Sequence, residues 1–184
     1  HYLHEWNRWR ARLFKFLVLH HDFSVFVLEC GLVEGRTVHD YVDGRDVPWD
    51  DVARAINNVW GVWAEINELI RWMREWNDRP DCPRRLRFYP MDGSGNWNHI
   101  RHAYAAVASF AARVDEALAA DLENALGEAV DEVTLENRVN VSPERFRQFI
   151  GEAQLLVRRI EQARGRSVEA SSFDDYDWAL RSAE

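Results

Sequence analysis

Apolar residues recur every three or four positions along most of the chain, which is the period of an amphipathic helix. This period, with its capping residues and its Pro and Gly breaks, predicts helices over residues 5–20, 33–41, 48–57, 59–77, 97–113, 115–126, 143–164 and 172–184. In the first helix, one apolar stripe is expected to pack in the core, with the basic side chains opposite. The stripe consists of Trp6, Trp9, Leu13, Phe16 and Leu17.

Two short runs depart from the helical period. Residues 23–28 (FSVFVL) are almost all apolar and rich in β-branched and aromatic side chains, which predicts a strand buried on both faces, as in parallel sheets. Residues 85–89 (RLRFY) predict a second strand, followed by a loop over 92–95. We therefore expect an α/β fold that is helix-rich, with a small, mostly parallel sheet under a helical cover. No linker or repeat divides residues 1–184, so we expect a single domain.

Composition narrows the class of protein. The chain has 184 residues, of which 47% are hydrophobic and 29% charged, enough to bury a core and solvate a surface. Its formal net charge of −8 argues against a nucleic-acid partner, and no apolar run is long enough to span a membrane. Cys30 and Cys82 form neither a disulfide framework nor a zinc-site spacing, which favours a reducing, cytoplasmic setting.

Candidate chemistry lies at the ends of the predicted strands, because sites in parallel α/β sheets form beyond the carboxyl ends of the strands. Glu29 directly follows the first strand, and Asp92 lies shortly after the second. His1 directly precedes the first helix, where a further strand could end, and Glu5 lies four residues on. A His beside a carboxylate can act as a general base near neutral pH.

Arg10 lies within the apolar stripe of the first helix, where a guanidinium needs a carboxylate partner. Glu29 is a candidate for that partner. From the residues alone, two interpretations stay open: the pair ties the helix to the strand, or it belongs to a functional site.

Other motifs give weaker signals or none. The sequence contains no G-x-S-x-G elbow, no P-loop and no G-x-G-x-x-G fingerprint. His99 and His102 could share a metal ion, but no third ligand has a defined spacing to them. Cys30 is better explained as a small apolar filler than as a nucleophile. The acidic stretch 115–136 is expected to be a solvated helix face.

Taken in order, these stretches resemble the erythromycin esterase family. The opening HYLHEWNRWRARLFKFLV resembles the family segment that begins at the His of its G-E-x-x-H motif, with a Glu four residues on and then R-x-R-L. FSVFVLE resembles the family's G-F-x-V-x-x-L/A-E strand. RLRFYPMD resembles its F-Y-G-x-D strand and follows a helix that ends in WMREWN. The resemblance extends over residues 1–130.

Members of this family are hydrolases, and the best-known ones open macrolide lactones and so confer antibiotic resistance. The resemblance implies that His1 is the general base that activates water, without a metal or other cofactor. Arg10 and Glu29 would be catalytic residues that position His1, the water or the ester. The implied substrate-binding residues are Glu5, Arg12 and Asp92.

The resemblance also implies a small-molecule ester or lactone as the substrate, with no nucleic-acid or membrane partner, and leaves the oligomeric state open. The chain lacks the strand and Glu that precede the motif His in the family, and it lacks the family's C-terminal half. We therefore expect a partial domain, truncated at both ends, whose activity needs the larger enzyme. Two alternatives stay open. One is a non-catalytic helical interaction fragment, and the other is a metal-dependent hydrolase with His1, Glu5, Glu29 and Asp92 as ligands.

Overall fold

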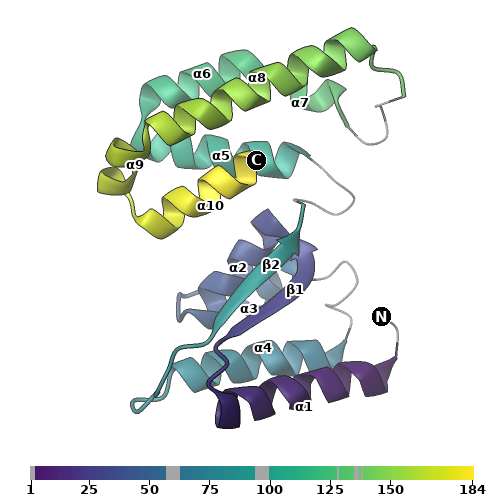
Figure 1. Cartoon of the computed structure of the whole chain (residues 1–184), viewed down its shortest axis with the longest axis vertical. Helices are drawn as coiled ribbons and strands as arrows, with labels where there is room; N and C mark the ends of the chain where they lie inside the picture. Colours follow the sequence, from purple (N-terminus) through teal and green to yellow (C-terminus); the bar gives the residue numbers. More distant parts are fainter. Residues whose placement is uncertain (1–2, 57–62, 94–99, 128, 135–136, 138) are drawn as a thin grey trace. The chain divides into compact units, whose positions relative to one another are not determined.

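The structure is a computed structural model that describes residues 3–56, 63–93, 100–127, 129–134, 137 and 139–184 (Figure 1). Contacts divide the chain into two compact units, His1–Gly93 and Ser94–Glu184, and each has its own hydrophobic core. The expectation of a single domain over residues 1–184 stays a prediction.

The described residues of the first unit form four helices and two strands. These are α1 (His4–His21), β1 (Val25–Gly31), α2 (Leu32–Val42), α3 (Trp49–Ala55), α4 (Ala64–Asn77) and β2 (Arg87–Asp92). They match the predicted elements in type and order. The predicted end of the third helix at Asn57 and the predicted start of the fourth at Val59 lie outside the described residues.

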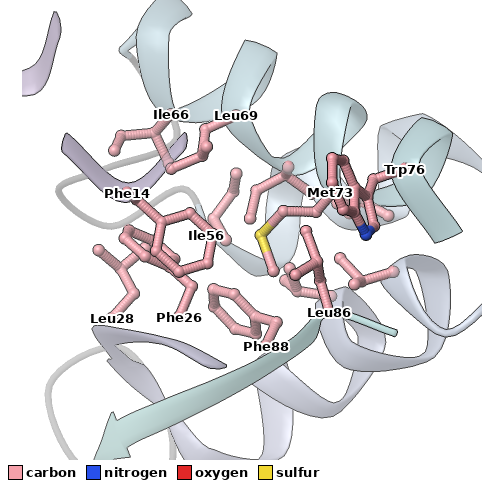
Figure 2. Packing of buried hydrophobic residues seen from close by; sticks show 14 of the residues in the cluster. Phe14, Phe26, Leu28, Ile56, Ile66, Leu69, Met73, Trp76, Leu86 and Phe88 are labelled. Carbon is pink, nitrogen blue, oxygen red and sulfur yellow. The ribbon is translucent and has the colours of Figure 1, made fainter. Parts of the chain in front are cut away.

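The strands β1 and β2 form a two-stranded parallel sheet in the described part of the chain, with Phe26 opposite Phe88 and Gly31 opposite Asp92. Helices α1 and α4 lie side by side against the sheet, and Figure 2 shows the core where they meet it. Met73 of α4 and Phe88 of β2 are fully buried there. The predicted fold class is confirmed: the protein has a helix-rich α/β fold with a small parallel sheet.

The buried face of α1 is not the predicted stripe. Its buried residues are Asn7, Phe14 and Val18. The helix carries apolar side chains on more than one face, and packing of the Phe14 ring against Phe26 decides which face meets the sheet. The pattern along one helix cannot reveal that choice. Four residues of the stripe are exposed: Trp6, Trp9, Leu13 and Phe16.

The prediction that β1 is buried on both faces is also wrong for the described residues. Phe26 and Leu28 are buried, but Val25 is 42% exposed and Val27 is 48% exposed. Helices α1 and α4 cover the face that carries Phe26, whereas α2 lies mainly against β2. The sequence showed an apolar strand, but burial depends on which elements cover each face.

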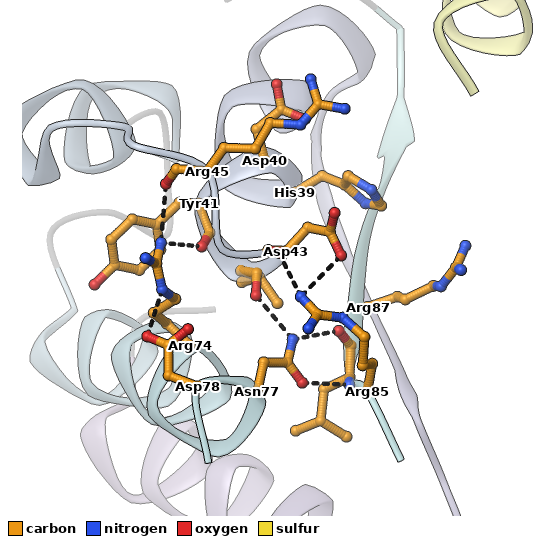
Figure 3. Close-up of polar contacts among 12 residues, drawn as sticks. His39, Asp40, Tyr41, Asp43, Arg45, Arg74, Asn77, Asp78, Arg85 and Arg87 are labelled. Atoms are coloured by element: carbon orange, nitrogen blue, oxygen red, sulfur yellow. Dashed lines mark hydrogen bonds and ion pairs between the residues drawn. The ribbon is translucent and has the colours of Figure 1, made fainter. Parts of the chain in front are cut away.

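Side chains from α4 and α2 hold the segment that contains β2 (Figure 3). The Asn77 amide nitrogen donates to the carbonyls of Val42 and Leu86, each at 2.8 Å, and its oxygen accepts from the Leu86 N–H at 2.7 Å. The Nδ1 of His39 donates to the Phe88 carbonyl at 2.8 Å. Both side chains are buried, so these bonds substitute for the water that the backbone of this segment would otherwise bind.

Helix α2 also approaches β2 closely at Gly35. A Cβ atom on Gly35 would lie 2.5 Å from the Cβ of Pro90 and 2.6 Å from its Cγ. The proline ring cannot move aside as a flexible side chain could, so glycine is needed here for close approach rather than for an unusual backbone conformation.

The described secondary-structure elements of the second unit are all helices. The helices are α5 (Ile100–Val114), α6 (Glu116–Leu126), α7 (Ala129–Glu132), α8 (Pro143–Gln162), α9 (Arg164–Ala170) and α10 (Phe173–Ala183). The predicted start of α5 at Trp97 lies outside the described residues. Asp115, Ser142 and Ser172 accept hydrogen bonds from backbone N–H groups and cap α6, α8 and α10. Acidic residues of the 115–136 stretch form ion pairs with arginines of neighbouring helices, as in the pairs Asp121–Arg159 and Glu132–Arg145.

Candidate functional site at the carboxyl end of the sheet

The predicted acidic residues Glu29 and Asp92 lie at the same end of the sheet. Glu29 is an exposed residue of β1, two positions before Gly31, which is the register partner of Asp92 in β2. The Asp92 carboxylate accepts a hydrogen bond from the Gly93 N–H at 2.8 Å. Because the two strands are parallel, both residues lie at the carboxyl end of the sheet, where sites in such sheets form.

Cys30 directly follows Glu29 in β1, and its side chain is buried. Burial, reinforced by the nearby carboxylates of Glu34 and Asp92, raises the pKa of the Cys30 thiol to about 12. The thiol is therefore protonated at neutral pH and is a poor nucleophile. This agrees with its interpretation as a small apolar filler.

The Glu34 carboxylate is a further acidic group near the carboxyl end of β1. It lies in the first turn of α2, which begins directly after β1, and it is half-buried. Its negative charge, like that of Asp92, raises the pKa of the Cys30 thiol. The sequence analysis did not select Glu34 as a site residue. The signal available was an acidic residue six positions beyond the end of the predicted apolar strand 23–28.

The polar residues predicted on α1 differ in their surroundings. Glu5 and Arg12 are exposed, whereas Arg10 is half-buried and donates to the Asn7 side-chain oxygen at 3.2 Å. Asn7 is fully buried, so it gives the Arg10 guanidinium a fixed partner within the same helix. The pairing of Arg10 with Glu29 stays a prediction.

His1 lies outside the described residues, and its role as a general base stays a prediction. The nearest histidine of the described chain is His4, whose Nδ1 contacts the Oε1 of Glu65. This contact joins the first turns of α1 and α4. Among the residues that the structure describes, no group of three or more His, Cys, Asp and Glu side chains is arranged to hold a metal ion.

The chain is thus a helix-rich α/β protein with acidic residues at the carboxyl ends of its parallel strands. A sequence model described as erythromycin esterase matches residues 18–184, and the protein therefore belongs to the erythromycin esterase family. Glu29 and Asp92 lie inside the matched range, whereas His1, Glu5, Arg10 and Arg12 precede it. A comparison with curated protein sequences found no significant match.

Solved structures share the fold at low sequence identity. A protein from Bacillus cereus aligns over 95% of this chain with a TM-score of 0.74 and 17% sequence identity. A succinoglycan biosynthesis protein aligns over 95% of this chain with a TM-score of 0.67 and 18% sequence identity. An erythromycin esterase mutant, EreC in its open conformation, aligns over 95% of this chain with a TM-score of 0.65 and 16% sequence identity. The alignments cover 41%, 40% and 44% of those chains, so this chain spans less than half of each.

Proposed function

We propose that this chain is part of a hydrolase that opens the ester bond of a small molecule, with a macrolide lactone as the leading candidate substrate. Membership of the erythromycin esterase family supports the reaction class. The observation that carries the proposal is the position of Glu29 and Asp92, both within the matched range, at one end of a parallel sheet.

In the proposed reaction, His1 takes a proton from a water molecule, whose oxygen attacks the ester carbonyl carbon. The tetrahedral intermediate then collapses, the carbon–oxygen bond of the ester breaks, and the leaving alkoxide receives the proton that His1 holds. Arg10 and Glu29 orient His1 and the reacting groups. The residues proposed to bind the substrate are Glu5, Arg12 and Asp92.

The proposal also includes the domain organisation of the enzyme, its location in the cell and its partner. The family match runs through both compact units, which supports one continuous domain of this family. No helix in the described residues is long and apolar enough to cross a membrane. Cys30 and Cys82 are free thiols, which supports a reducing, cytoplasmic location. The reaction as proposed draws only on side chains and water, and its partner is a small molecule.

The test measures hydrolysis of erythromycin and of nitrophenyl esters by the gene product that carries this chain. His1→Gln should lower kcat on the order of 10² to 10⁴-fold, the usual contribution of a general base. Glu29→Gln should also lower kcat, whereas His20→Gln, at the exposed end of α1, should leave it unchanged. Because a histidine must be neutral to accept a proton, kcat/KM should be higher at neutral pH than at acidic pH. Undiminished turnover by the His1 variant would refute the assignment.

A further inference from the structure

Two Asp-Gly dipeptides occur in the sequence, Asp43–Gly44 and Asp92–Gly93. This dipeptide is prone to isomerisation, because glycine has no side chain to shield its backbone nitrogen from the carboxyl group of the preceding aspartate. Both dipeptides are exposed, so water reaches each of them. Their hydrogen bonds differ, and this difference separates a protected dipeptide from a reactive one.

Hydrogen bonds to other residues hold Asp43–Gly44 (Figure 3). The Arg85 guanidinium donates to the Asp43 carboxylate at 3.2 Å and also donates to the Asp43 carbonyl oxygen. The Gly44 N–H donates to the Tyr41 carbonyl at 3.1 Å. The two groups that would have to react with each other are therefore both engaged elsewhere, and the Gly44 N–H points to Tyr41 rather than to the carboxylate of Asp43.

Asp92–Gly93 has the opposite arrangement. The Gly93 N–H donates to the Asp92 carboxylate at 2.8 Å, so this bond holds the nitrogen against the carboxyl group that it would attack. In the described part of the chain, no ion pair fixes the Asp92 carboxylate as Arg85 fixes that of Asp43. Strand β2 ends at Asp92, so Gly93 lies beyond the paired strand and is exposed.

We propose that Asp92–Gly93 is a site of isoaspartate formation in the native protein, and that its contacts protect Asp43–Gly44 from the same reaction. The Gly93 nitrogen attacks Cγ of the protonated Asp92 carboxyl group and loses its proton, while the carboxyl hydroxyl group leaves as water. The product is a succinimide ring. Water then opens the ring at one of its two carbonyl carbons. Opening at Cγ restores aspartate, whereas opening at the main-chain carbonyl carbon leaves an isoaspartyl bond of unchanged mass.

This rearrangement alters the carboxyl end of the sheet. In isoaspartate the chain runs through the side-chain carbons of Asp92, so the backbone after β2 is longer by a methylene group. The former main-chain carbonyl becomes the free carboxylate, and the negative charge moves with it. Turnover should therefore decline as isoaspartate accumulates. This consequence for turnover rests on the proposed function, in which Asp92 binds the substrate, whereas the modification itself does not.

The test incubates the gene product that carries this chain in neutral buffer at physiological temperature. A protein carboxyl methyltransferase with S-adenosylmethionine labels isoaspartate, and peptide mapping by mass spectrometry assigns each label to a residue. Isoaspartate should accumulate severalfold faster at Asp92 than at Asp43. In the urea-unfolded chain the two rates should be similar, because the hydrogen bonds that distinguish the two dipeptides are lost.

Gly93→Ala is the matched variant, because a Cβ atom beside the attacking nitrogen hinders the reaction. It should slow isoaspartate formation at Asp92 severalfold and leave Asp43 unchanged, with circular dichroism checking that the fold is retained. Equal rates at Asp92 and Asp43 in the native protein would overturn the proposal. So would the absence of isoaspartate at Asp92 when the unfolded chain forms it there. If the gene product hydrolyses no ester, the proposed function fails, and the distribution of isoaspartate still supports or overturns the modification.

Discussion

The ring of Phe14 on α1 lies 5.0 Å from the ring of Phe26 on β1, and the two rings are tilted by 55°. The indole of Trp72 on α4 meets Phe14 edge-on at 6.5 Å. One phenylalanine therefore joins the first helix to both the sheet and the neighbouring helix. Because Phe14 is buried, this contact sets the rotation of α1 and leaves the tryptophans at its start exposed.

Phe14→Ala is expected to destabilise the protein by about 3–5 kcal/mol, because it removes these ring contacts and leaves a cavity. Phe16→Ala is the matched control, since Phe16 lies on the same helix but is 49% exposed, and it should cost less than about 1 kcal/mol. Urea unfolding followed by circular dichroism measures both. Equal costs would show that the rotation of α1 described above is incorrect.

Gly35→Ala should destabilise the protein by about 2 kcal/mol or more, because its new methyl group would collide with the Pro90 ring. Gly151→Ala provides the opposite case. A Cβ on Gly151, within α8, has no neighbouring atom within 4 Å, so this change should stabilise the protein by about 0.5–1 kcal/mol. Thermal unfolding of the two variants should therefore shift in opposite directions, and a gain from both would contradict the close approach of α2 to β2.

Asn77→Ala should cost about 2–4 kcal/mol, because it leaves the N–H and C=O of Leu86 and the carbonyl of Val42 buried without partners. Asn140→Ala serves as the control, since Asn140 is exposed and its side-chain nitrogen donates to the side-chain oxygen of Asn137. Chemical denaturation measures the difference. Amide exchange at Leu86 should also accelerate in the Asn77 variant, and retention of its protection would speak against the described bonds.

The Cys30 thiol should resist alkylation in the folded protein. With a pKa of about 12, the fraction of thiolate at pH 8 is on the order of 10⁻⁴, so iodoacetamide should modify the half-buried Cys82 first and Cys30 only after unfolding. The folded-state pKa lies above the ordinary value of 9.0. Cys30 therefore contributes its stabilisation fully below pH 9 and loses it as pH rises through 12. Peptide mass mapping after labelling distinguishes the two thiols, and rapid labelling of native Cys30 would contradict its burial.

The type and order of the elements could be predicted because they depend on local patterns. The period of α4 and the Ser-Pro start of α8 lie within single stretches of sequence, and both helices are present in the structure. The position of Glu29 and Asp92 at one end of the sheet could also be predicted, because parallel strands bring their carboxyl ends together.

The faces of the elements could not be predicted in the same way. Trp6 and Trp9 fit a buried stripe by spacing, but α1 has apolar residues on more than one face, and a contact with a residue on another element selects the face. Likewise, the bond between His39 and the Phe88 carbonyl joins residues 49 positions apart. No local pattern encodes such a partner, so this hydrogen bond could be identified only from the three-dimensional structure.

The bonds of Asn77 with Leu86 also bear on the order in which the sheet assembles. These residues are nine positions apart, so the loop that joins them closes at a small entropic cost. Pairing of β2 with β1 instead links segments roughly sixty residues apart, which requires a much larger search. The side chain at the end of α4 is thus expected to align the segment that leads into β2 at a smaller entropic cost than the strand pairing requires.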